Sequence, residues 1–200
     1  MSLTIRSTKG QRLLRNVYDF DNTIYRGDSS VDFFRHCASK YPRVYFSALC
    51  SLPGLFLMQL GLMDKTRAKQ RFYRYLHLVP DVREEVERFW LTHDANLKDW
   101  YFAQKREDDL IISASPEFLL EPLMKQLKLC FLASRVSPES GVYEGKNCHG
   151  EEKVRRMREA YPETQIAEFY SDSKNDAPLA RLAREAYMVK GDALSPFPLD

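Results

Sequence analysis

The sequence predicts an α/β fold in which a parallel sheet carries helices on both faces and a block of helices follows the first strand. In the second half of the chain, short apolar runs that suit buried strands alternate with helical segments, and such alternation produces parallel sheets. A further apolar run, residues 13–20, stands alone, because no convincing strand interrupts residues 29–100. We therefore expect a helical block between the first strand and the rest of the sheet.

The first strand and the helical block are predicted from hydrophobic periodicity. Residues 13–20, LLRNVYDF, form an apolar run that leads into Asp19 and Asp21, as a buried strand does when it ends in a polar loop. Between residues 29 and 100, apolar side chains recur three or four positions apart, which is the spacing of amphipathic helices. Examples are Val31, Phe33, Phe34 and Cys37, and later Val82, Val86, Phe89 and Trp90.

The remaining elements alternate between strand and helix. Residues 109–115, DLIISAS, predict a strand, and Pro116 suits the start of the helix that follows. Further strands are predicted at 128–134, 166–170 and 186–190, and helices at 151–161 and 176–185. Three glycines within residues 141–150 indicate a hairpin or loop.

Composition excludes several classes of protein. The 200 residues are 44% hydrophobic and 29% charged, which is typical of a soluble globular chain. The 30 basic and 28 acidic residues are mixed, without the long basic run that follows a phosphate backbone, so nucleic acid is not an expected partner. The four cysteines are far apart and form no C-x-x-C pair, which favours free thiols in a reducing compartment. They are Cys37, Cys50, Cys130 and Cys148.

The amino-terminal segment favours a cytoplasmic location. The first eighteen residues carry four basic side chains and no acidic ones, but they lack the apolar stretch of a secretory signal. An organellar presequence is the alternative, because Arg6, Arg12 and Arg15 with scattered Ser and Thr fit one loosely.

Residues 44–63, VYFSALCSLPGLFLMQLGLM, are uncharged and about as long as a membrane-spanning helix. Pro53 and Gly54 at the middle indicate two short helices instead. A single crossing would also place Asp19 and Ser113 on opposite sides of a membrane. We expect no transmembrane span, and contact with a membrane surface or an oligomer interface through this segment remains open.

Two acidic clusters lie at predicted strand ends, where parallel sheets bind ligands. Asp19 and Asp21 are two positions apart, and two close carboxylates need a cation or a basic group beside them. Asp172 and Asp176 follow another strand, and carboxylate oxygens of this kind suit Mg²⁺. Taken singly, each cluster is also typical of helix caps, and Asp176 is well placed as the N-cap of its helix.

The order of four motifs resembles that of the haloacid dehalogenase superfamily, in its phosphoserine phosphatase-like branch. The motifs are DFDNT at residues 19–23, IISAS containing Ser113, GEEK ending at Lys153, and DSKND at residues 172–176. The helical block lies where that branch inserts its cap. The resemblance implies a Rossmann-like core made of residues 1–24 and 101–200, with residues 25–100 as a small helical cap.

The resemblance also implies a magnesium-dependent phosphatase with these catalytic residues. Asp19 would attack phosphorus and form an aspartyl-phosphate, and Asp21 would act as general acid and then general base. Ser113 would donate a hydrogen bond to a phosphoryl oxygen, and Lys153 would neutralise charge on the phosphate and on Asp19.

The metal and substrate contacts follow from the same resemblance. The Mg²⁺ site would comprise Asp19, the Asp21 carbonyl and Asp172, with Asp176 orienting the metal's waters or Lys153. The predicted substrate contacts are Asp28, Ala114 and Asn175.

Some residues depart from the branch pattern. Asp21 argues against the dehalogenase members, which lack this acid. Asp28 stands where true phosphoserine phosphatases use an acidic residue for the substrate amine, but its side chain is shorter. Ala114 and Ser115 replace two glycines. The expected substrate is thus a small phosphorylated metabolite, of which phosphoserine is one candidate.

Three questions are left open by the sequence. A phosphotransferase or mutase would use the same intermediate, and a catalytically silent binding protein would keep the same fold. Arg26, Arg67 and Arg71 suit either an anionic substrate or a solvated surface. The apolar residues 44–63 are also compatible with a pocket for a lipid-like leaving group.

Overall fold

The computed structural model describes residues 13–46 and 70–199, and a six-stranded sheet forms its centre. The strands are β1 (Leu13–Tyr18), β2 (Leu110–Pro116), β3 (Cys130–Ser134), β4 (Thr164–Ser171), β5 (Ala183–Lys190) and β6 (Ala193–Pro196). They follow the spatial order β3-β2-β1-β4-β5-β6, in which only β6 is antiparallel to its neighbour. The predicted α/β fold with a parallel sheet is confirmed.

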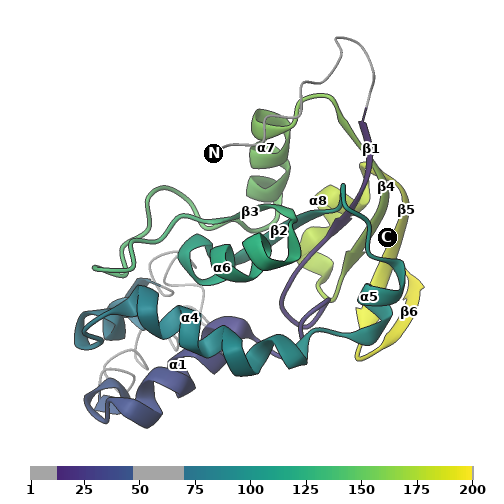
Figure 1. The fold of residues 1–200 in the computed structure, drawn as a ribbon. Coiled ribbons are helices and arrows are strands. Elements are labelled where there is room, and N and C mark those ends of the chain that lie inside the picture. The colour runs from purple at the N-terminus through teal and green to yellow at the C-terminus, as the bar shows by residue number, and fades with distance from the viewer. Residues whose placement is uncertain (1–12, 47–69, 200) are drawn as a thin grey trace.

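Helices cover both faces of the sheet (Figure 1), because successive residues of a strand point to opposite sides. Val17 of β1 packs in one cluster with Val154 of α7 (Glu151–Ala160) and Leu179 of α8 (Ala177–Ala180). The next residue, Tyr18, packs in the other cluster with α5 (Asp99–Gln104) and α6 (Glu117–Leu127).

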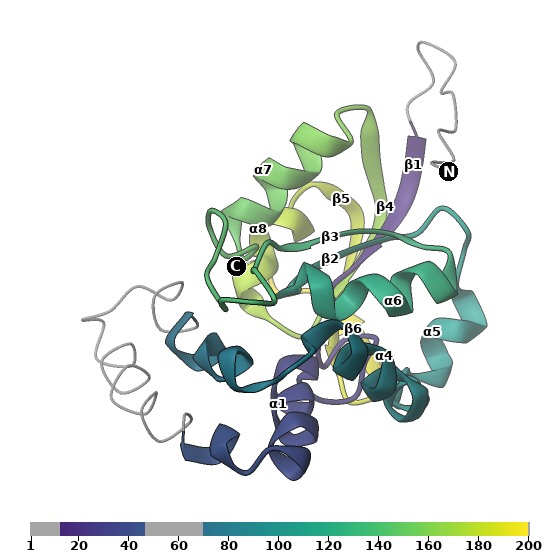
Figure 2. The same ribbon diagram turned by 60° about the vertical axis from the view of Figure 1, so that its left-hand side comes forward.

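Between β1 and α5 the described residues form helices joined by loops, as predicted, with β-bridges only at Asp21, Tyr25 and Leu97. It contains α1 (Ser29–Lys40), η1 (Tyr73–Leu78), α4 (Val82–His93) and η2 (Asp94–Asn96). Figure 2 shows α1 and α4 beside α6, at the side of the sheet away from α7. Phe33, Phe89 and Trp90 share one hydrophobic cluster with Leu119 of α6, and the Trp90 indole nitrogen donates to the Leu119 carbonyl at 2.6 Å. The helical insertion is thus anchored on the core.

Near the carboxyl terminus one prediction is wrong and one strand was missed. The helix expected at 176–185 is only a 3-10 turn, η3 (Lys174–Asp176), and the short α8, which ends at Ala180. Residues 183–185 have helix-forming side chains, but their backbone pairs with β4, where Ala183 lies opposite Ile166. The antiparallel β6 was not predicted, although Gly191, with φ of +59°, and Asp192 are typical turn residues.

Several sequence predictions fall partly outside the described residues. Most of residues 44–63 lies there, as do Cys50 and Arg67. Cys37, Cys130 and Cys148 are free thiols. Within residues 13–46 and 70–199, no helix combines the length and the apolar character needed to cross a bilayer.

A buried carboxylate ties α1 to α4. Glu85 is 1% exposed and accepts hydrogen bonds from Lys40 at 2.7 Å, Arg88 at 2.8 Å and the Tyr41 hydroxyl at 3.1 Å. His36 lies 2.8 Å away on the same carboxylate. Burial opposes the charge, yet these hydrogen bonds, that of Lys40 first, lower the pKa of Glu85 to about 2.

We expect Glu85→Gln to lower the free energy of unfolding by about 2 kcal/mol at neutral pH, since the folded-state pKa of Glu85 lies below its ordinary 4.5 and solvent screens part of the effect through the half-exposed Lys40 and Arg88. This stabilisation is present above pH 4.5 and is lost as the pH falls through about 2. Urea unfolding across this range measures it. Glu84→Gln is the control, because Glu84 is half exposed and its pair with Arg88 contributes at most ~1 kcal/mol. Equal effects of the two substitutions would contradict the account.

The loop before α7 closes against η1 at a glycine. A Cβ on Gly141 would lie 2.4 Å from the carbonyl oxygen of Tyr73, and the φ of Gly141 is +66°. Gly191 has a similar φ of +59°, but a Cβ there would meet nothing within 4 Å. Both positions therefore disfavour alanine through the backbone, and only Gly141 adds a collision.

We expect Gly141→Ala to lower the free energy of unfolding by about 2 kcal/mol more than Gly191→Ala does, because the first forces η1 and the loop apart. Denaturant unfolding of the two variants side by side gives the difference. Equal destabilisation would show that the loop does not hold η1 closely.

Candidate active site

Three predicted site residues meet where adjacent strands end. Asp19 directly follows β1 and Asp172 directly follows β4. Ser113 lies midway along β2 but close to the level of the end of β1, because Tyr18 pairs with Ile111. Because β1 is flanked by β2 and β4, the three side chains share one edge of the sheet. The backbone N–H of Asp19 donates to the Tyr170 carbonyl at 2.9 Å, and that of Asp172 donates to the Thr23 hydroxyl at 3.0 Å. These bonds fix the two acidic loops relative to each other.

Lys153 is enclosed between two carboxylates. It comes from the first turn of α7 and is 2% exposed, and its ammonium group donates to Asp19 Oδ1 and Asp176 Oδ2, both at 2.7 Å. Asp176 also accepts from the Ser171 hydroxyl at 2.8 Å. Burial opposes the charge of Lys153, but Asp19 and Asp176 raise its pKa above the ordinary value. The ammonium group is therefore fixed against Asp19.

One lysine does not balance the carboxylates at this edge. Burial raises the pKa of Asp19, and the negative charges of Asp176 and Asp21 raise it further. Lys153 lowers it, and the resulting pKa is about 7. Burial and then the charge of Asp176 raise the pKa of Asp172, while Lys153 lowers it. Crowded carboxyl groups that resist ionisation indicate a place for a further cation.

The donors at this edge suit a hard cation. Asp19 and Asp172 offer carboxylate oxygens, and the Asp21 main chain adds a carbonyl, a set that Mg²⁺ prefers over softer metals. Among the residues described, no group of three or more His, Cys, Asp or Glu side chains is arranged to hold a metal. Asp176, predicted with the metal ligands, is instead bonded to Lys153 and Ser171. A metal here would thus depend on two carboxylates and main-chain oxygen.

Asp21 is held between the start of α1 and the end of β2. Its Oδ1 accepts from the Ser29 backbone N–H at 2.7 Å, and its Oδ2 accepts a short hydrogen bond from the Ser115 hydroxyl. Burial and then the charge of Asp28 raise the pKa of Asp21 to about 6, while the bonds from Ser115 and Ser29 lower it. A carboxyl group with a pKa close to neutrality suits proton transfer in both directions.

Ser113 is buried and oriented as a hydrogen-bond donor. Its hydroxyl oxygen accepts from the Ser115 backbone N–H at 3.0 Å. The hydroxyl hydrogen is then available for an acceptor in the site, such as an oxygen of an anion.

The three predicted substrate contacts have structural partners of their own. Asp28 caps α1 by accepting from the Val31 backbone N–H at 3.0 Å, although its charge reaches Asp21. The Ala114 carbonyl accepts from the Ser134 hydroxyl at 3.0 Å. Asn175 is exposed and donates to the Ser173 hydroxyl at 3.1 Å. Asp28 therefore acts as a helix cap. Asp176, for which capping was the alternative interpretation, lies at the N-cap of α8, but its side chain makes no capping hydrogen bond.

Sequence reasoning missed two residues that shape the site. Lys98 is 2% exposed and donates to the carbonyls of Asn22 and Gly191, each at 2.6 Å, which ties the Asp19 loop to the β5–β6 turn. Nothing in the sequence distinguishes it from a solvated lysine. Ser115 was noted as a departure from glycine, but its bond to Asp21 was not predicted.

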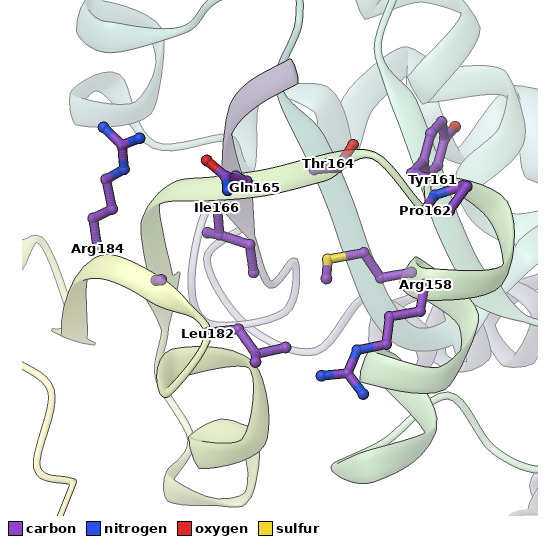
Figure 3. A pocket seen from close by; sticks show the side chains of 10 residues that line it. Arg158, Tyr161, Pro162, Thr164, Gln165, Ile166, Leu182 and Arg184 are labelled. Atoms are coloured by element: carbon purple, nitrogen blue, oxygen red, sulfur yellow. The ribbon is translucent and has the colours of Figure 1, made fainter. Parts of the chain in front are cut away.

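A separate cavity lies at the opposite edge of the sheet (Figure 3). Its volume is about 430 Å³, and it is lined by the end of α7 and by the first residues of β4 and β5. Arg158 and Arg184 lie at its sides, and no carboxylate is among its lining residues. It therefore offers neither the nucleophile nor the metal donors of the carboxyl edge.

Comparison with known proteins identifies the family of the chain. The model of the haloacid dehalogenase-like hydrolase family matches residues 17–181. Protein CicA of Caulobacter vibrioides is 27% identical over 195 aligned residues, which cover 88% of this chain and 86% of that protein.

Solved structures share the fold at low sequence identity. A protein of unknown function from Bordetella pertussis Tohama I is similar with a TM-score of 0.68 and 17% identity, covering 88% of this chain and 89% of the other. A phosphoserine phosphatase solved as a phospho-aspartyl intermediate analogue has a TM-score of 0.54 and 13% identity, covering 88% and 86%. The fold is therefore phosphoserine phosphatase-like, and the chain belongs to the haloacid dehalogenase-like hydrolase family.

Proposed function

We propose that the chain is a magnesium-dependent phosphatase that hydrolyses a small phosphorylated metabolite through an aspartyl-phosphate on Asp19. The observation that carries this proposal is the setting of Asp19. Its carboxylate lies at the end of β1, 2.7 Å from the buried Lys153 ammonium, and Asp172 follows the adjacent strand β4 at the same edge of the sheet. A nucleophile in direct contact with a fixed cation thus shares one edge of the sheet with a second carboxylate for a metal.

The residues divide the reaction into two steps. In the first, a carboxylate oxygen of Asp19 attacks phosphorus, the bond to the leaving oxygen breaks, and Asp21 gives its proton to that oxygen. Lys153 and the Ser113 hydroxyl stabilise charge on the phosphoryl oxygens. In the second, Asp21 takes a proton from water, the water oxygen attacks phosphorus, and the bond to Asp19 breaks. Phosphate leaves and both carboxyl groups return to their starting states.

The metal in this proposal is held by oxygen ligands. Asp19, Asp172 and the Asp21 carbonyl would bind it, and Asp176 would position Lys153 rather than the metal. When bound, Mg²⁺ offsets the repulsion between the nucleophile and the phosphoryl group.

Residues 25–100 would act as a cap over a core formed by residues 1–24 and 101–200. Asp28, Ser29 and Ser30 at the start of α1 lie beside Asp21, so the leaving group would meet this helix. The Asp28 carboxylate is the group best placed to receive an amine, which keeps phosphoserine among the candidates. The cytoplasmic location, and any contact with a membrane surface or a second copy through residues 44–63, stay predictions.

The proposal is tested by phosphate release from a panel of phosphomonoesters that includes phosphoserine, phosphorylated alcohols and lipid phosphates. Turnover with magnesium, lost in EDTA and in Asp19→Asn, is expected, and the panel ranks the substrates. Transfer of the phosphoryl group to an added alcohol in place of water would favour a phosphotransferase. No turnover together with no phosphoryl group on Asp19 would favour a silent binding protein.

We also expect Mg²⁺ to raise the melting temperature more at about pH 8 than at about pH 5, because the ligands must lose their protons to bind a metal. In metal-free protein the pKa of Asp19 is raised to about 7 and that of Asp21 to about 6. The folded state therefore binds more protons than the unfolded state between these values and the ordinary 3.8, and its stability falls as the pH rises through that interval. Thermal unfolding with Mg²⁺ or EDTA measures the shift, and Asp172→Asn should abolish most of it. An equal shift at both pH values would contradict this ligand set.

A further inference from the structure

We propose that Ser115 is a positioning residue for Asp21 and that a chain of buried hydroxyl groups connects it to Tyr73 of the helical insertion. This inference rests on the proposed function, in which Asp21 protonates the leaving group. It adds a residue of the IISAS segment, and two residues of the insertion, to the machinery of that step.

The chain is built from four side chains in contact. The Ser115 hydroxyl donates to Asp21 Oδ2. Its oxygen lies 3.1 Å from the Ser29 hydroxyl oxygen and 3.2 Å from the Ser30 hydroxyl oxygen, and only Ser30 continues the chain to Tyr73. The Tyr73 hydroxyl donates to the Ser30 oxygen at 2.9 Å. The three hydroxyl-bearing residues are nearly inaccessible to solvent, with exposures of 2% for Ser115, 8% for Ser30 and 2% for Tyr73.

The directions of these hydrogen bonds follow from Tyr73 and Asp21, the residues at the two ends of the row of hydroxyl groups. Tyr73 donates to Ser30, and Ser115 donates to the carboxylate, so the Ser30 hydrogen is the one available to join Ser30 to the Ser115 oxygen. Every hydroxyl then donates in the same direction, from the insertion toward Asp21. Bonds aligned in this way polarise one another and strengthen the last one.

The row of hydroxyl groups and the α1 backbone together restrict the orientation of the Asp21 carboxyl group. Ser115 holds Oδ2, and the Ser29 backbone N–H holds Oδ1 at 2.7 Å. One bond thus comes from the end of β2 and the other from the start of α1. The position of the acid is set jointly by the sheet and by the insertion, so contact between them and proton transfer to the leaving group are linked.

The exact position of the Asp21 carboxyl group affects the rate of cleavage only where the leaving group needs a proton. An alkoxide is a strong base and leaves slowly unless it is protonated, whereas 4-nitrophenolate is weakly basic and leaves without help. Loss of the Ser115 hydroxyl should therefore slow the cleavage of alkyl phosphates selectively. A role limited to folding, or to phosphate binding, would slow both kinds of ester equally.

The test measures kcat/KM for phosphoserine or the best alkyl phosphate of the panel and for 4-nitrophenyl phosphate, because this ratio reports the steps up to the transfer of phosphorus to Asp19. We expect Ser115→Ala to lower it about 10- to 100-fold for the alkyl ester and at most about 3-fold for the aryl ester. Tyr73→Phe should lower the alkyl value about 3- to 10-fold. Its effect should vanish in the Ser115→Ala background, because the chain is already broken there.

Tyr75→Phe is the matched control. Tyr75 belongs to the same η1 segment and is fully buried, but its hydroxyl has no hydrogen-bond partner among the described residues. This variant should leave both esters unaffected. Far-ultraviolet circular dichroism and the melting temperature check that each variant is folded.

Equal losses for the two esters in Ser115→Ala would overturn the inference, and so would independent effects of Ser115→Ala and Tyr73→Phe. Wild-type protein that cleaves neither ester would overturn the proposed function, and the inference would fall with it. Wild-type activity that is retained without the selective loss overturns the inference alone, so the two failures are distinguishable.

Discussion

Asp19→Asn is expected to lower kcat at least about 10⁴-fold and, at the same time, to raise the melting temperature of the metal-free protein. Asparagine is nearly the same size as aspartate, but its amide does not form the aspartyl-phosphate. The gain in stability follows from the raised pKa of Asp19, about 7 in place of 3.8, since above that interval folding must bury an unfavourable charge. In the variant, Lys153 keeps Asp176 as its partner at 2.7 Å.

The expected gain in the free energy of unfolding is about 1–3 kcal/mol near pH 8 and disappears toward pH 4. Thermal unfolding in EDTA measures it, together with an assay on the best ester of the panel. Asp108→Asn is the control, because Asp108 lies before β2 and pairs with Arg106 at the surface. An Asp19→Asn variant that is inactive and also less stable than wild type would contradict the account of a crowded acidic site.

Lys153→Met is expected to lose both activity and stability. Methionine fills the buried volume but leaves Asp19 and Asp176 facing each other without a cation. Removing one partner of a buried ion pair costs about 3–5 kcal/mol. Without the ammonium group at the phosphoryl oxygens, kcat/KM should fall about 10³-fold.

Two further variants separate these effects. Arg155→Met changes a cation on the same helix, but the side chain of Arg155 is 58% exposed and its ion pairs should contribute at most ~1 kcal/mol. Adding Asp176→Asn to Lys153→Met removes one unpaired carboxylate and should restore part of the stability without restoring activity. Urea unfolding and steady-state kinetics give both quantities. If Lys153→Met and Arg155→Met lower the free energy of unfolding equally, the buried ion pairs of Lys153 with Asp19 and Asp176 do not stabilise the fold.

The sheet and the acidic edge were predictable because both depend on local sequence. Apolar runs that end in Asp19, Ser113 and Asp172 identify strands and place their polar ends at one edge of a parallel sheet. The helix predicted at 176–185 failed because pairing with β4 outweighs the helix propensity of residues 183–185. Local sequence does not report such long-range pairing.

The contacts between the insertion and the core were not predictable. Ser115 and Tyr73 are 42 residues apart, and they are joined only because α1 and η1 pack beside the end of β2. Lys98 resembles a surface lysine in the sequence, but the structure buries it between two carbonyl groups. Asp176 occupies the N-cap position that was expected, yet its carboxylate binds Lys153 instead of the helix. Each of these roles depends on a partner that is distant in the chain.

The most direct test of the proposed mechanism is rapid acid quenching of the protein during turnover of a labelled phosphomonoester with Mg²⁺, followed by peptide mass spectrometry. We expect label on the peptide that contains Asp19, formed and lost at rates compatible with turnover, and absent in EDTA and in Asp19→Asn. Label on another residue, or phosphate release that continues in Asp19→Asn, would contradict the assignment of Asp19 as the nucleophile.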